Sequence, residues 1–241
     1  MIPRLAPDPQ DASLVNEYLV AVAKAGFAGD ISADRSVQVV FATDNSIYEL
    51  APKAVLFPRS SDDVSVALRL LAQPAFRNVK LAARGGGTGT NGQSLSDGVV
   101  LDISRYLNGI LEINAKEGWV RVQAGVVKDQ LNAALQTHGM FFAPELSTSN
   151  RATIGGMINT DASGQGSCLY GKTRDHVLEL TSVLSDGTLW TSRPLDDLQL
   201  EHAKRAPGIV GDIHRVIDQL HRDNAAAIER QFPKLNRCLT G

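Results

Sequence analysis

A run of nine residues from Arg84 to Gly92, with the sequence RGGGTGTNG, constrains the fold more than any other feature of the chain. Gly87, Gly89 and Gly92 match the GxGxxG pattern of Rossmann folds, in which a helix begins at the glycines and an acidic residue follows about 20 positions later. Only residues 93–98 separate this run from the next expected strand, so no helix fits there. No GK[ST] follows the glycines, which excludes a Walker phosphate-binding loop.

The remaining interpretation is a loop of free main-chain amides between two strands. Five glycines fall within residues 85–92, and a backbone without Cβ atoms can close around an anion such as a diphosphate. Thr88, Thr90 and Asn91 add side-chain donors. A surface turn without a ligand is the alternative, but the position between two expected buried strands favours an anion cradle.

Hydrophobic periodicity predicts a small β-α-β-β unit around this loop. Its helix begins at Ser61, and its strands are expected at 54–57, 79–83 and 99–103. An amphipathic helix capped by Asp11 and ended by Gly26 precedes the unit.

Two hairpins and two further helices are expected in the rest of the chain. The hairpin strands cover 110–113 with 119–122, and 177–184 with 188–190; the second pair is joined by Asp186-Gly187, a strong turn signal. The helices are expected over 128–138, ended by Gly139, and over 209–232. These elements divide the chain into an N-terminal helical extension (1–49), a first subdomain (50–108) and a second subdomain (109–241).

A second unusual stretch runs from Pro144 to Gly164. Its pair Gly155-Gly156 follows small polar residues, so the backbone can press against a flat or charged ligand there and begin a short helix. Close helix packing at the two glycines is the alternative for this stretch taken alone.

Five motifs in a fixed order connect these observations. Between about Ala54 and Trp190 the chain contains PRSSDDV, ARGGGTGTNG, VQAGV, PELSTSNRATIGGMINTDASG and YGKTRDHVLELTSVLSDG. In this order they resemble the FAD-binding domain of the vanillyl-alcohol oxidase (PCMH-type) superfamily, and within it the FAD-linked oxidases such as D-2-hydroxyglutarate, D-lactate and glycolate dehydrogenases. The resemblance implies an α+β fold of two lobes, a small β-α-β-β lobe and a larger lobe of mixed or antiparallel sheet with helices, with FAD stretched between them.

The resemblance also assigns cofactor contacts. The first loop would hold the pyrophosphate, the second would line the pyrophosphate and the isoalloxazine, and the strand after the YG motif would run beside the adenosine half. The residues implied to bind FAD are Arg84, Gly85, Gly86, Gly87, Thr88, Gly89, Thr90, Asn91, Gly92, Pro144, Ser147, Thr148, Ser149, Ile154, Gly155, Gly156, Asn159, Asp161, Ala162, Gly164 and Val177.

Several departures from the family pattern modify this expectation. Thr88 stands where many relatives carry a histidine bonded to the flavin, so FAD is expected to be bound non-covalently. Cys168 lies away from the position of cysteinyl-flavin members and is expected to be a small buried residue. Relatives also add a GxxGxxG segment and a substrate cap, neither of which follows Phe232. The second subdomain is therefore expected to be incomplete, and the rest of the polypeptide to supply a cap and an iron-sulfur domain.

The activity that the resemblance implies is that of an FAD-dependent oxidoreductase acting on CH-OH groups, in which a 2-hydroxy acid passes a hydride to flavin N5. It leaves the electron acceptor open and identifies no catalytic base. The histidines are expected at a helix end (His138), in a structural role (His176), or in the C-terminal helical region (His202, His214 and His221). Two alternatives remain: a reductase of the UDP-N-acetylenolpyruvylglucosamine reductase type, and a non-catalytic flavin-binding fragment or partner.

Composition argues against several other classes. The 24 basic and 26 acidic residues give a formal net charge of -2 without a basic block for nucleic acid. Two distant cysteines, Cys168 and Cys238, and scattered histidines predict no metal site. No apolar run approaches the ~18 residues of a membrane span, and residues 1–10 are not typical of a signal peptide. A cytoplasmic protein is expected.

Overall fold

A four-stranded sheet forms the centre of the first lobe in the computed structural model, which describes residues 11–232. Its strands are β1 (Asp30–Ser32), β2 (Ala54–Phe57), β3 (Leu81–Arg84) and β4 (Val99–Asp102), in the order β1-β2-β4-β3. β2 and β3 both run parallel to β4, whereas β1 pairs antiparallel with β2. Every residue of β2 and β4 is buried, as is usual for parallel strands covered on both faces.

Three helices cover this sheet: α1 (Ala12–Lys24), α2 (Arg35–Phe41) and α3 (Ser61–Leu71). The Asp11 carboxylate caps α1 by accepting from two main-chain amides, as its sequence position predicts. Tyr18 of α1 is fully buried, and its hydroxyl donates to the carbonyl oxygen of Ala67 in α3 at 2.9 Å. Residues 11–49 therefore contribute an edge strand and part of the core of this lobe, in addition to the expected helix.

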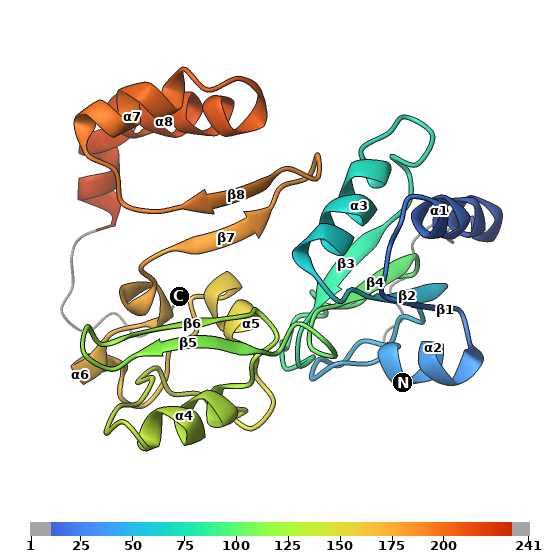
Figure 1. Ribbon diagram of the computed structural model, residues 1–241, viewed down its shortest axis with the longest axis horizontal. Helices are drawn as coiled ribbons and strands as arrows, with labels where there is room; N and C mark the ends of the chain where they lie inside the picture. The colour runs from blue at the N-terminus through green and yellow to red at the C-terminus, as the bar shows by residue number, and fades with distance from the viewer. Residues whose placement is uncertain (1–10, 233–241) are drawn as a thin grey trace.

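The second lobe contains two antiparallel hairpins and four short helical segments (Figure 1). The hairpins are β5 (Ile110–Asn114) with β6 (Trp119–Val122), and β7 (Leu180–Val183) with β8 (Leu189–Ser192). The helical segments are α4 (Lys128–Gln136), α5 (Ile154–Asn159), α6 (Ser167–Tyr170) and the 3₁₀ helix η1 (Thr173–His176). The α+β prediction is confirmed, although β3 and β7 begin two to three residues later than the patterns indicate.

The turn of the β7–β8 hairpin links the two lobes. Gly187, in the left-handed region at φ +84°, lies against α3, and the Ser65 hydroxyl of that helix donates to its carbonyl oxygen. The space between the lobes is therefore bridged at the end of the hairpin.

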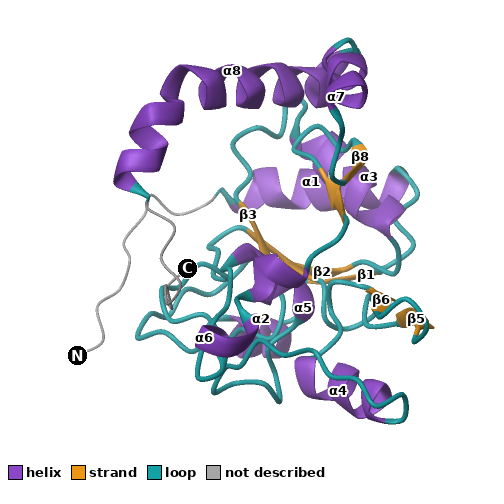
Figure 2. Cartoon of the chain, turned by 90° about the vertical axis from the view of Figure 1, so that its left-hand side faces the viewer, coloured by secondary structure: helices purple, strands orange, loops and turns teal. Residues whose placement is uncertain are grey.

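Helices α7 (Asp197–Lys204) and α8 (Gly208–Gln231) pack against each other, with Lys204 of α7 paired to Asp218 of α8. Figures 1 and 2 both place this pair on the side of the molecule opposite α4. No helix in the described part of the chain, α8 included, is long and apolar enough to cross a membrane.

The expectation of a buried Cys168 is wrong, because the residue is exposed. α6 is a single turn at the surface, in which Ser167 faces inward and the three following side chains face outward. Cys238 and residues 1–10 lie outside the described residues.

Candidate cofactor-binding cleft

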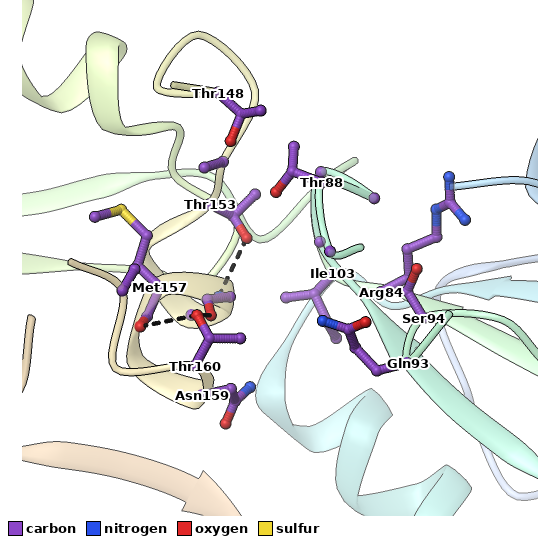
Figure 3. A pocket seen from close by; sticks show the side chains of 18 of the residues that line it. Arg84, Thr88, Gln93, Ser94, Ile103, Thr148, Thr153, Met157, Asn159 and Thr160 are labelled. Atoms are coloured by element: carbon purple, nitrogen blue, oxygen red, sulfur yellow. Dashed lines mark hydrogen bonds between the residues drawn. The ribbon is translucent and has the colours of Figure 1, made fainter. Parts of the chain in front are cut away.

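The two glycine-rich segments meet across one cavity of about 270 Å³ between the lobes. In Figure 3, Thr88 and Ile103 lie on one side of this cavity, and Thr153, Met157 and Asn159 lie on the other. β3 and β4 are parallel, so their carboxyl ends open at the same sheet edge, where ligands of parallel sheets usually bind. The topology thus brings the first segment to the cleft.

About half of the residues that the sequence assigns to the cofactor line this cavity. They are Arg84, Gly85, Gly86, Gly87, Thr88, Gly89, Thr148, Gly155, Gly156, Asn159 and Ala162. The others do not line it: Thr90, Asn91, Gly92, Pro144, Ser147, Ser149, Ile154, Asp161, Gly164 and Val177. The lining also includes residues without a prediction, among them Ala83, Gln93, Ser94, Ile103, Ala124, Leu146, Ala152, Thr153 and Met157. Ala124 belongs to the VQAGV motif, the one signal that could have pointed to it.

The first segment presents unpaired main-chain donors. Within the described residues, no hydrogen bond uses the amides of residues 85–90 as donors, although neighbouring residues such as Asn91 and Leu95 do donate. Gly87 has a φ of +61°, which glycine adopts without strain. A row of unpaired amides of this kind can bind an oxyanion.

Glycine is required at two positions because the segments touch. A Cβ atom on Gly85 would overlap the Thr153 side chain, and one on Gly86 would overlap the carbonyl oxygen of Arg151. The missing side chains therefore allow the first segment to pack against the second, in addition to exposing the backbone. The sequence interpretation attributed them only to contact with an anion.

Three main-chain amides of the second segment donate to partners inside the second lobe. The amides of Ile154 and Gly155 donate to the carbonyl oxygens of Val126 and Ala124, both at 2.8 Å. The amide of Gly156 donates to the Thr153 hydroxyl at 3.3 Å. A Cβ on Gly155 would lie 2.7 Å from the Cβ of Ala124, so this glycine serves the packing of α5. At Gly156 only the Thr153 hydroxyl, at 3.2 Å, would be met.

Arg84 lines the cavity but turns its charge away from the second segment (Figure 3). Its Nη2 atom donates to the carbonyl oxygen of Thr43 at 2.8 Å, and the guanidinium lies over the Phe41 ring. Nη1 is buried and has no hydrogen-bond partner among the described residues. Burial lowers the pKa of this guanidinium, an effect that Asp44 and Asp102 oppose.

The lining carries neither a carboxylate nor a histidine among the described residues. An anionic ligand therefore meets no like charge in this cavity. The same lining offers no general base for the oxidation of an alcohol. His176 is used structurally: Nε2 lies 2.8 Å from the carbonyl oxygen of Tyr170, and the ring contacts Phe142 edge to face.

The cavity fits a dinucleotide such as FAD. Unpaired amides and hydroxyls suit its diphosphate, and the apolar side chains of Ile103, Leu146 and Met157 suit a flat ring system. Thr88, which the resemblance places where many relatives carry a histidine bonded to the flavin, lines the cavity, and its hydroxyl group cannot form a histidyl linkage.

Comparison with known proteins agrees with this geometry. Residues 52–193 match the model of a family described as "FAD binding domain". The chain is 63% identical over 225 residues to a D-2-hydroxyglutarate dehydrogenase of Pseudomonas putida, which covers 93% of the chain and 22% of that protein. It is 50% identical to a D-2-hydroxyglutarate dehydrogenase of Escherichia coli, with 100% of the chain and 24% of that protein covered. The chain thus spans about a quarter of the length of these curated relatives.

A solved structure shows the same fold. The carbohydrate oxidase from Microdochium nivale, in complex with a substrate analogue, aligns with a TM-score of 0.63 and 19% identity, over 76% of this chain and 38% of that one. This likeness confirms the prediction of a PCMH-type α+β fold. The family match covers more than half of the chain, and its cofactor is the one that the cavity fits. The chain belongs to the FAD-binding domain family.

Proposed function

We propose that this chain is the FAD-binding part of a flavin-dependent dehydrogenase that oxidises a 2-hydroxy acid at its CH-OH group. The observation that carries the cofactor site is the row of unpaired amides at residues 85–89, which line a cavity without a lining carboxylate. The substrate class rests on the dehydrogenases at 63% and 50% identity.

In this proposal the two segments have separate tasks. The amides of residues 85–89 would bind the diphosphate, and the hydroxyl of Thr88 would add a donor. Asn159 and Thr160 of the second segment, with the apolar Met157, line the cavity and would orient the isoalloxazine and shield it from water. FAD, when bound, supplies the hydride acceptor. The base for the substrate hydroxyl comes from outside this lining, because no described lining residue can take up that proton.

The identity of the relatives favours a dehydrogenase over a reductase of the UDP-N-acetylenolpyruvylglucosamine reductase type. A non-catalytic flavin carrier would use the same cavity and differs only in its response to substrate.

The experiment is an anaerobic titration of the purified, intact protein. The protein should be yellow and should release its flavin on acid precipitation, as non-covalent binding requires. Its flavin should bleach on addition of D-2-hydroxyglutarate. Bleaching by NADPH instead would favour a reductase, and a yellow protein inert to both donors would favour a carrier. A colourless protein that takes up no FAD would overturn the cofactor site itself.

A further inference from the structure

Asp161 occupies an unusual backbone position at the end of α5. It is the non-glycine residue with a positive φ, +44°, in the described part of the chain. Its amide donates to the carbonyl oxygen of Ile158 at 3.2 Å, and the amide of Ala162 donates to that of Met157 at 2.9 Å. These two bonds form a Schellman motif, which usually places glycine at this position. An aspartate here indicates that its side chain has a task.

The Asp161 carboxylate faces the YGKTRD segment rather than the cavity. Its Oδ1 accepts from the main-chain amide of Arg174 at 3.0 Å. Its Oδ2 lies 3.8 Å from Lys172 Nζ and 3.6 Å from Arg174 Nε. The Lys172 side chain is only 6% exposed and that of Asp161 20%, so solvent screens their attraction less than it screens a surface pair.

Thr173, between these two cations, holds the next residue of the second segment. It is fully buried. Its amide, at 3.2 Å, and its hydroxyl, at 2.7 Å, both donate to the carbonyl oxygen of Ala162. Lys172, Thr173 and Arg174 thus all contact the residues at the end of α5, Asp161 and Ala162.

Asp161 and Ala162 lie at the wall of the cavity. Asn159, Thr160 and Ala162 all line the cavity, whereas Asp161 between them does not. Figure 3 shows Asn159 and Thr160 on the α5 side of the cavity, opposite Gln93. A change in the backbone at Asp161 would therefore move the wall on both sides of it.

We propose that Lys172, Thr173 and Arg174 are positioning residues that hold the wall formed by residues 159–162 in its FAD-binding conformation, with Asp161 as their anchor rather than as a cofactor ligand. The inference rests on the proposed function in one respect, that FAD occupies this cavity. It assigns a task to the YGKTRD motif, which makes no direct contact with the cavity in the described residues.

The test compares Asp161→Asn, Lys172→Met and Lys172→Arg in the intact protein. Hydrogen exchange of the FAD-free protein reports on the wall, and flavin fluorescence quenching gives the dissociation constant of FAD. Asp161→Asn and Lys172→Met should each increase amide exchange at residues 159–164, leave residues 85–92 unchanged and weaken FAD binding about tenfold. Lys172→Arg should keep the amide exchange and the FAD affinity of the unmodified protein. The visible circular dichroism of bound flavin should change only in Asp161→Asn and Lys172→Met.

Glu112→Gln is the matched control, because Glu112 forms an exposed ion pair with Arg121 in the same lobe. It should leave exchange and affinity as in the unmodified protein. Weaker FAD binding by Asp161→Asn without a change in exchange would make Asp161 a direct ligand and overturn the inference. Unchanged exchange and affinity in both disruptive variants would overturn it as well. Failure of the unmodified protein to bind FAD would instead reject the proposed function.

Discussion

The two glycine-rich segments look alike in sequence but differ in what their backbones do. In residues 85–90 the main-chain amides donate no hydrogen bond within the described residues, whereas those of residues 154–156 all donate to partners inside the second lobe. The main-chain amides of the first segment are therefore available to a ligand. Those of the second segment are already used within the lobe and make it a rigid wall.

The comparison shows that glycine content alone does not identify an anion cradle. Gly86 and Gly155 are both glycines for steric reasons, since a Cβ on either would run into a neighbouring segment. An anion cradle differs from a packed helix in whether its main-chain amides already donate hydrogen bonds within the protein. The following predictions test that difference, in order of decreasing effect.

Replacement of Gly86 by valine should have the largest effect. The new Cβ would overlap the carbonyl oxygen of Arg151 and separate the two segments. We expect FAD affinity to fall at least about 100-fold, roughly 2.7 kcal/mol. The purified variant should therefore retain little flavin, measured as the amount that acid releases. Thr90→Val is the control, because Thr90 is exposed in the same loop and does not line the cavity. Full flavin content in Gly86→Val would refute the contact between the segments as a requirement.

The adjacent glycines of α5 provide a sharper comparison. In Gly155→Ala the methyl group would press on Ala124, and overpacking of this kind costs about 1–3 kcal/mol of folding free energy. In Gly156→Ala the methyl group meets only the Thr153 hydroxyl, and alanine in a helix gains about 0.5–1 kcal/mol over glycine. Urea denaturation should therefore separate the two variants by at least about 1 kcal/mol. Equal destabilisation would contradict the different surroundings of the two glycines.

The binding of FAD by the amides of the first segment should depend only weakly on salt. The described lining contains one charged side chain, Arg84, and its guanidinium is bonded to Thr43. Binding by neutral amides should depend weakly on ionic strength. We expect the dissociation constant of FAD to change less than about threefold between 0.05 and 0.5 M NaCl, where the Debye length falls from about 14 to 4 Å. A steep dependence would reveal cations outside the described lining.

Sequence reasoning located both segments and their meeting in one cleft, because motif order and strand parallelism are local or topological signals. It could not find which amides are used, since the partners of Ile154 and Gly155 lie some 30 residues earlier in the chain, at Val126 and Ala124. It also missed β1, because three residues are too few to show an alternating pattern. It assigns Asp161 to the cofactor, whereas in the structure the Asp161 carboxylate faces Lys172 and Arg174 and the residue does not line the cavity.

The smallest expected effect concerns the carboxylate beneath the first segment. Asp102 lies opposite Arg84 in the β3–β4 register, and burial raises its pKa, although hydrogen bonds from Ser104 and from the amide of Arg105 oppose the shift. Asp161, within the second segment, lies beside the cations Lys172 and Arg174 instead.

A raised folded-state pKa means that the folded protein binds the proton more tightly than the unfolded chain, so the contribution of Asp102 to stability is complete below the unfolded pKa of about 3.9 and is lost as pH rises through the folded pKa. Asp102→Asn keeps an acceptor for the Arg105 amide and removes this titration. Relative to the unmodified protein, its unfolding free energy should therefore increase from pH 4 towards neutrality and then remain level. The same difference at every pH in chemical denaturation would show that Asp102 titrates alike in both states, and that this carboxylate is more open to water than its 4% exposed fraction indicates.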